Sequence, residues 1–390
     1  MSALTARGVG LLVAAVVLVG TGFRFAYPEL TLLGAAAGIA VGYAVLTAAR
    51  RPRLAVTRSA DPDRVARGEP AVMTLTVRNA GRLRAASLVA EDRCGDRAVP
   101  VPLLRLRPGR DTTVSYDVPT ARRGVVPVGP LRVTRRDPLG LVALARPYGD
   151  TVPVWVHPRV HPLNAVPTGA GRSLDGRVDR VPHGSITFDS LREYVVGDEL
   201  RRVHWRTSAR VGELMVRENV DTSLPRIVVL LDNRAAAHPE RVAGVAESFE
   251  SACEAAASVL VAAYRADLPV VLLLVAPEPD GPGAAGDGMA HAGGPLDRLA
   301  AVRLVDDDVL DAATARLRRE RLGDTLVFLT GAGGRGGLGV VGALRAAYAS
   351  VVVGVFGAAE STPAGAAGLV VIDAVDGAAF AAEWDGVRRW

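Results

Sequence analysis

The sequence contains no lysine, and all 46 of its basic residues are arginine. Isoleucine is also scarce, with four residues in 390. This bias is typical of a GC-rich genome, so the net charge of +5 and the pI near 9.7 say little about partners. A nucleic-acid surface needs arginines clustered on one face with aromatic residues between them. Here the arginines are spread along the chain and mixed with 41 acidic residues, so we expect no nucleic-acid partner.

Cysteine and aromatic residues are also few. Cys94 and Cys253 are too few and too far apart in the chain for a disulfide framework or a zinc site. We expect two buried thiols in a reducing compartment. Aromatics make up only 5%, but hydrophobic residues reach 49% and the mean hydropathy is +0.23. These values exclude a disordered chain and suggest a membrane-attached part.

Two uncharged segments lie near the N-terminus. Gly8–Phe23 has 16 residues without charge and Leu30–Ala49 has 20. At about 1.5 Å per residue the second can cross a bilayer core of about 30 Å, and the first can do so with its flanks. A cleaved signal peptide is the alternative, but a second span follows after six residues and no A-x-A site precedes it. We predict a transmembrane helical hairpin over residues 1–50, in contact with the lipid bilayer through residues 8–49.

The arginines around these segments predict the orientation. One arginine precedes the first segment, and the connecting turn balances Arg24 against Glu29. Four follow the second segment closely: Arg50, Arg51, Arg53 and Arg58. The positive-inside rule then places both ends of the hairpin, and the bulk of the chain, in the cytoplasm.

Residues 51–158 follow a period of two. Met73, Leu75 and Val77 alternate with Thr74 and Thr76, and similar short runs recur between Gly, Pro and Asn. This pattern predicts an all-β, immunoglobulin-like sandwich of about seven antiparallel strands. No catalytic pattern occurs in this stretch.

Residues 159–221 form a predicted connecting segment. Residues 159–187 are rich in Pro, Gly and Arg, which favours an irregular connection. Residues 188–221 hold six arginines and seven acidic residues. Val203 and Trp205 alternate with polar neighbours, which predicts a strand with one buried face. We favour a structural network of Arg–carboxylate pairs around a buried Trp205, with a docking surface as the second interpretation. A catalytic role for His204 or Asp198 is remote, because no nucleophile or metal-ligand set accompanies them.

Residues 222–390 alternate strand and helix. The predicted strands are Arg226–Asp232, Val270–Val275, Thr325–Thr330, Ser350–Phe356 and Leu369–Ile372. The predicted helices are His238–Ala266, Asp306–Arg321 and Ala378–Arg389. This order predicts an α/β, Rossmann-like domain with a mostly parallel sheet covered on both faces. Ligands in such folds bind at the carboxyl ends of the strands, near Asp232 and after Thr330.

A glycine-rich stretch follows Thr330. Gly331–Gly336 matches G-x-G-x-x-G between a strand and a predicted helix. The dinucleotide fingerprint belongs to a first strand and requires an acid at the end of the next one, whereas here the next strand ends in Phe356 and Gly357. We interpret the stretch as a flexible glycine loop.

Two motifs carry a resemblance to a known family. They are Arg136-Asp137-Pro138-Leu139-Gly140-Leu141 and the block LREYVVGDELRRVHWRTSAR at residues 191–210. Together with the order of the domains, they resemble the domain-of-unknown-function-58 family over essentially the whole chain. The resemblance implies a von Willebrand A-like domain over residues 222–390 and a membrane-attached partner of MoxR-type AAA+ ATPases. The interaction residues that it implies are Arg192, Tyr194, Gly197, Asp198, Arg202, His204, Trp205, Arg206, Ala209 and Arg210.

Many von Willebrand A domains hold Mg²⁺ through an Asp-x-Ser-x-Ser loop, a Thr and a further Asp. This sequence keeps Asp232 but has Arg234 and Ala236 where the serines would lie, and Thr330-Gly331 where Thr-Asp-Gly is usual. Mg²⁺ needs octahedral oxygen ligands, and an arginine among them would repel it. We therefore predict that the metal site is lost and expect no cofactor.

These observations predict a membrane-anchored, cytoplasm-facing, non-enzymatic scaffold or adaptor that works with a MoxR-type ATPase in envelope or complex assembly. The alternative is a module that binds a small ligand, a metal or a nucleotide, at the strand ends of the α/β domain. A hydrolase that uses His204 is a remote third class.

Overall fold

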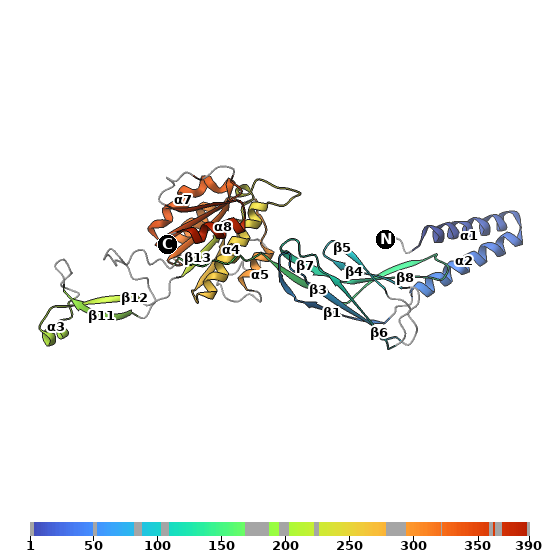
Figure 1. The fold of residues 1–390 in the computed structure, drawn as a ribbon. Helices are drawn as coiled ribbons and strands as arrows, with labels where there is room; N and C mark the ends of the chain where they lie inside the picture. The colour runs from blue at the N-terminus through green and yellow to red at the C-terminus, as the bar shows by residue number, and fades with distance from the viewer. Residues whose placement is uncertain are drawn as a thin grey trace. The chain divides into compact units, whose positions relative to one another are not determined.

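The computed structural model describes residues 4–49, 53–81, 88–102, 109–167, 187–194, 203–221, 226–277, 294–320, 322–358, 362 and 369–387. The chain divides into two compact units, Met1–His157 and Pro158–Trp390 (Figure 1). Their boundary lies within one residue of the predicted end of the β-rich region.

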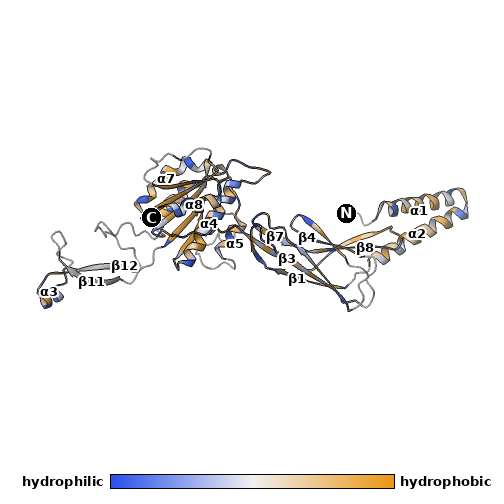
Figure 2. Ribbon diagram, viewed as in Figure 1, coloured by the Kyte–Doolittle hydropathy of each residue, from blue (hydrophilic) through white to orange (hydrophobic). Residues whose placement is uncertain are grey.

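The N-terminal unit begins with two antiparallel helices, α1 (Ala6–Phe25) and α2 (Pro28–Ala49). Both are long and apolar enough to cross a membrane by length and composition (Figure 2). A side chain at Gly34 would lie 2.7 Å from the Val19 side chain and 2.9 Å from the carbonyl oxygen of Ala15. Glycine therefore allows the two helices to pack closely. The predicted helical hairpin is confirmed, with each helix starting two residues before its uncharged segment.

The β-rich region contains two sheets with strand orders β1-β3-β6 and β2-β10-β7-β4-β8-β9, and β5 pairs with β4. Met73, Leu75 and Val77 are fully buried between the sheets, as their alternation predicted. The described residues of this region hold ten strands rather than about seven, because short strands such as β2 and β5 carry no periodic pattern. The strands are β1 (Leu54–Asp61), β2 (Arg64–Ala66), β3 (Val72–Asn79), β4 (Leu88–Cys94), β5 (Arg97–Val101), β6 (Asp111–Asp117), β7 (Gly124–Val128), β8 (Leu131–Arg136), β9 (Ala143–Tyr148) and β10 (Val152–His157).

A buried ion pair joins the two sheets. Arg58 on β1 donates to both carboxylate oxygens of Asp92 on β4, at 2.8 and 3.1 Å. Tyr116 on β6 donates its hydroxyl to the same carboxylate at 2.6 Å, and its burial raises the pKa of the phenol. The predicted buried thiols are confirmed, since Cys94 and Cys253 are both free and buried.

The C-terminal unit begins with residues 158–167, which are irregular as predicted; the rest of that connection lies outside the described residues. An antiparallel hairpin of β11 (Thr187–Glu193) and β12 (Met215–Asp221) follows. Between its strands lies a short helix, α3 (Trp205–Val211). The predicted strand around Val203 and Trp205 is therefore wrong. The His204 side chain caps the helix N-terminus, and Gly212 ends it in the left-handed region at φ 88°.

The parallel sheet has the order β14-β13-β15-β16-β17. Its strands are β13 (Ile227–Leu231), β14 (Val270–Leu274), β15 (Thr325–Gly331), β16 (Ser350–Phe356) and β17 (Val370–Ala374). Ile227, Val229 and Leu231 belong to one apolar core, and Val228 and Leu230 belong to a second. Both faces of the sheet are therefore covered, which explains why the strands read as continuous apolar runs.

Two helix starts differ from the predictions, and one helix was not predicted. Helix α4 (Glu247–Arg265) begins nine residues after His238, because Ala243 and Gly244 take positive φ values of 50° and 79° in a turn. Helix α6 (Leu310–Glu320) begins after the run of acids at residues 306–308. The short helix α5 (Pro295–Ala301) was not predicted. The glycine stretch forms a 3-10 helix, η4 (Ala332–Gly337), and is followed by α7 (Leu338–Gly342); α8 (Gly377–Gly386) ends the fold.

Candidate functional site

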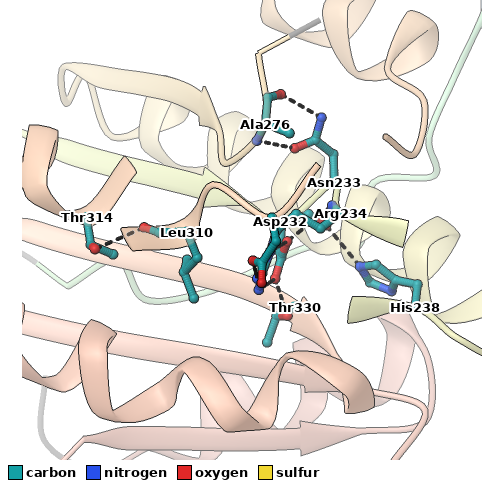
Figure 3. A network of polar contacts seen from close by, with 9 residues as sticks. Asp232, Asn233, Arg234, His238, Ala276, Leu310, Thr314 and Thr330 are labelled. Carbon is teal, nitrogen blue, oxygen red and sulfur yellow. Dashed lines mark hydrogen bonds and ion pairs between the residues drawn. The ribbon is translucent and has the colours of Figure 1, made fainter. Parts of the chain in front are cut away.

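The carboxyl ends of β13 and β15 bring Asp232 and Thr330 together (Figure 3). Thr330 Oγ1 donates to Asp232 Oδ2 at 2.7 Å. Arg234, two residues after Asp232, donates from Nε to Oδ1 at 2.9 Å and from Nη2 to Oδ2 at 2.8 Å. Asp232 and Thr330 are fully buried, and Arg234 is 7% exposed. The site predicted at these strand ends is thus a closed, bidentate ion pair.

The opposite side of the guanidinium meets Asp308. Arg234 Nη1 donates to the Asp308 carboxylate, whose side chain is 81% exposed. Backbone bonds place it there, since Ala235 N donates to the Val305 carbonyl at 2.8 Å and Val305 N donates to the Asn233 carbonyl at 2.9 Å. The hydrogen bonds to Asp232, followed by the hydrogen bond to Asp308, raise the pKa of Arg234 above its ordinary value.

These residues do not fit a magnesium ion. The Arg234 guanidinium already binds both carboxylate oxygens of Asp232, and the Thr330 hydroxyl donates its proton to one of them. A divalent cation at Asp232 would have to displace a buried positive charge. Elsewhere among the described residues, no group of three or more His, Cys, Asp or Glu side chains could hold a metal ion.

A second buried contact, which the sequence did not predict, lies beside Asp232. His238 Nε2 is 2.9 Å from the Asp232 carbonyl oxygen and His238 Nδ1 is 2.9 Å from Ser248 Oγ. The carbonyl can only accept, so Nε2 carries a proton and neutral Nδ1 accepts from Ser248. Burial lowers the pKa of His238. His238 is fully buried, so its ring touches protein groups rather than solvent. The sequence carries no indication of these contacts, because His238 was predicted to be the first residue of a helix.

The glycine stretch is packed, so its interpretation as a flexible loop is wrong. A side chain at Gly334 would lie 1.9 Å from Thr330 Oγ1, and one at Gly331 would lie 2.3 Å from the Ala237 carbonyl oxygen. A side chain at Gly333 would meet the carbonyl oxygen of Ala236 at 2.2 Å. These three glycines therefore let η4 approach the segment after β13, and the close backbone approach serves packing.

The family motif around α3 is only partly described. Gly197, Asp198 and Arg202 lie outside the described residues, and the side chain of Arg192 does too. Tyr194 is half-buried, and its backbone N–H donates to the Leu214 carbonyl at 2.8 Å. The part of the predicted Arg–carboxylate network that involves Asp198 and Arg202 therefore lies outside the described residues.

His204 is a helix cap. Its Nδ1 lies 2.7 Å from the Thr207 hydroxyl and accepts from Thr207 N at 3.2 Å. Ser208, the buried residue of α3, accepts from Met215 N at 2.8 Å and so joins the helix to β12. Both bonds of His204 involve Nδ1, so this ring nitrogen has a structural role as a helix cap.

The other face of α3 is exposed. Trp205, Arg206, Ala209 and Arg210 are all exposed, with Trp205 at 62%. Trp205 and Ala209, like Arg206 and Arg210, are four residues apart and lie on one side of the helix. The premise of a buried Trp205, on which the structural interpretation depended, is wrong.

Comparison with known proteins gives one family match. Residues 190–305 match the family model described as "Protein of unknown function DUF58", which confirms the resemblance to this family over these residues, including the block at residues 191–210. The motif at residues 136–141 lies outside the match. No curated protein matches the chain. Among solved structures, the CARDB domain of the PF1109 protein from Pyrococcus furiosus is 18% identical, with a TM-score of 0.21 over 27% of this chain and 93% of that domain. A β-glucosidase from Listeria innocua is 14% identical, with a TM-score of 0.16, and the match covers 16% of that enzyme. At such TM-scores, neither likeness assigns a fold or an activity to this chain.

Proposed function

We propose that this chain, with its DUF58 match, is a membrane-anchored, cytoplasm-facing adaptor without chemistry of its own that works with a MoxR-type AAA+ ATPase. In this proposal α1 and α2 span the bilayer and the two packed sheets form an immunoglobulin-like sandwich. The parallel-sheet part is a von Willebrand A-like domain that has lost its metal. The ATPase partner and a role in envelope or complex assembly come from the family resemblance.

The exposed face of α3 is the observation that carries the proposal. Interface hot spots are enriched in tryptophan and arginine. Trp205, Arg206 and Arg210 lie together on a helix whose opposite side is bonded to β12. A tryptophan that is 62% exposed contributes little to the stability of its own fold, so a partner accounts for it better than packing does.

The strand-end site supports an adaptor more than a ligand-binding module. Both oxygens of Asp232 are bound by protein groups, and Arg234 fills the position next to them. His238 is buried, and Nδ1 of His204 caps a helix. These groups therefore serve the fold.

Capture of the ATPase tests the proposal. We expect the purified full chain in lipid nanodiscs to retain the organism's MoxR-type ATPase, and Trp205→Ala to weaken this retention at unchanged melting temperature. The double variant Arg206→Ala/Arg210→Ala should act alike. Arg318→Ala/Arg319→Ala, which removes two exposed arginines from α6, is the matched control. Retention that is equal for all these variants would refute α3 as the docking face.

The orientation needs its own test. A reporter fused after residue 60 should behave as cytoplasmic, and one placed after residue 27 should behave as external. The positive-inside bias of the arginines is the reason. An external signal from the fusion at residue 60 would overturn the cytoplasmic location.

A further inference from the structure

The turn between β8 and β9 holds the first family motif, and its shape is tightly determined. Asp137 is 5% exposed, and its carboxylate accepts from Leu139 N at 2.8 Å and from Val142 N at 2.6 Å. Gly140 takes a φ of +70° and donates its N–H to the Asp137 carbonyl at 3.0 Å. These bonds hold Pro138 and Leu139 at the tip of a rigid turn.

This turn is bonded to the start of α1. Thr5 N donates to the Leu141 carbonyl at 2.9 Å, and Thr5 Oγ1 donates to the Gly140 carbonyl at 2.8 Å. A side chain at Gly8 would lie 2.1 Å from the Leu141 carbonyl oxygen, so glycine is needed for this approach. Gly8 is the first residue of the uncharged segment, because Arg7 carries the last charge before it. The turn therefore lies level with the boundary of the apolar helix.

The turn between β8 and β9, together with β9, also contacts the C-terminal part of α2. Leu141 and Val142 form one buried apolar cluster with Val41, Ala44 and Ala48 of α2. Arg146 on β9 donates from Nη2 to the carbonyl of Ala49, the last residue of that helix, at 3.2 Å. The β8–β9 turn and β9 are thus bonded to the start of α1 and to the end of α2. These two helix ends lie next to each other, because the helices are antiparallel.

These contacts leave the side chain of Leu139 exposed. Leu141 and Val142 are buried against the helices, whereas Leu139 at the tip is 53% exposed. Arg7, one residue before Gly8, is exposed as well. Leu139 and Arg7 both lie where the apolar helix meets its charged flank. At a lipid interface, an exposed leucine can contact the acyl chains and an exposed arginine can bind the phosphates.

We propose that the turn Asp137–Val142 is seated in the membrane interface, with Leu139 inserted among the phospholipids of the leaflet that holds the start of α1 and the end of α2. Leu141 and Val142 pack against α2, which is apolar enough to cross a membrane, and this attachment selects lipid as the occupant of the neighbouring Leu139. This inference rests on the membrane attachment proposed above. It gives the motif a role as a brace between the helical hairpin and the β-rich region.

Fluorescence quenching in lipid nanodiscs tests it on the full chain. Leu139→Cys carries a polarity-sensitive fluorophore, and Val125→Cys on β7, also an exposed apolar position, is the matched control. The native cysteines are buried, and the unmodified chain should take up no label. We expect the label at 139 to lose fluorescence with phosphatidylcholine that carries a nitroxide near the headgroup and to resist iodide. The label at 125 should behave in the opposite way.

Several outcomes would overturn the proposal. A label at 139 that iodide quenches as well as the label at 125, on a chain that co-elutes with the nanodiscs, refutes insertion and leaves membrane attachment intact. A label protected from both quenchers means that protein, such as a second copy, covers the turn, and this also refutes lipid insertion. A chain that does not co-elute with the nanodiscs refutes the attachment itself.

Discussion

Arg234 and Asp232 lie two residues apart in the chain and form a buried, bidentate ion pair at the carboxyl end of β13. Asp232 ends a continuous apolar strand, and Arg234 turns back onto it because residues 233–235 pair with Val305. A cation at this strand end is therefore supplied by the chain itself. The same arrangement makes the contacts of the site testable by substitution.

Arg234→Ala should destabilise the C-terminal unit by about 3–5 kcal/mol, because it leaves the buried carboxylate of Asp232 without its partner. Arg316→Ala removes an exposed partner of Glu320 and should cost about 0.3–0.5 kcal/mol. Urea unfolding of the full chain in detergent measures both. A further Asp232→Asn change should recover part of the loss in the Arg234→Ala background, because the unpaired charge disappears. Equal stability of Arg234→Ala and Arg316→Ala would contradict the buried pair.

Millimolar Mg²⁺ should leave the melting temperature of the chain unchanged, since Arg234 fills the place of a cation. One-site binding at 100 times the dissociation constant would add about 2.7 kcal/mol of stability. Thermal melts with Mg²⁺ and with a chelator measure the difference. A rise that Asp232→Ala abolishes would instead favour the small-ligand module.

Gly334→Ala should destabilise the C-terminal unit by about 1–3 kcal/mol, as overpacking usually does. The new methyl group would strike Thr330 Oγ1 and disturb the bond to Asp232. Gly336→Ala is the matched control, because a side chain there meets nothing within 4 Å. It should stay within about 0.5 kcal/mol of the parent chain. Similar melts for the two variants would mean that η4 does not pack as described.

The stability of the C-terminal unit should fall as pH drops below about 6.5, the ordinary pKa of histidine. Burial lowers the pKa of His238, so the unfolded chain takes up a proton before the folded chain does. The stability that neutral His238 contributes is complete above the pKa of this histidine in the unfolded chain. It is lost as the pH falls towards the lower pKa of His238 in the folded chain. Urea unfolding at a series of pH values measures the slope. His238→Gln should flatten it, and an unchanged slope would count against a buried neutral His238.

His204→Ala should destabilise the hairpin around α3 by about 1 kcal/mol, whereas His204→Asn should restore most of it, because asparagine is a good N-cap. Hydrogen exchange of peptides that cover residues 203–221 measures the local loss. Rescue by asparagine is expected for a cap. If both variants instead lost an enzymatic activity of the parent chain, the result would favour a catalytic role for His204.

The order of the elements follows from local patterns. Uncharged runs predicted α1 and α2, alternation predicted strands such as β3, and continuous apolar runs predicted β13 and β16 within one residue. These signals work because burial is repeated at the period of the backbone itself. The sequence alone also indicates that the side chains of Arg234 and Ala236 offer no oxygen ligand after Asp232.

The contacts of the site were decided by tertiary structure. No local pattern indicates that Asp308 meets Arg234, because 74 residues separate them. The same holds for His238, which leaves the predicted helix to bond with the Asp232 carbonyl and Ser248. Alternation around Val203 and Trp205 resembled a strand, but the cap by His204 and the turn at Gly212 favoured a helix. Residue types and periods along this chain determined which elements form. Only packing between distant segments decided which charges meet, and whether a tryptophan ends up inside or outside, because both depend on partners far away in sequence.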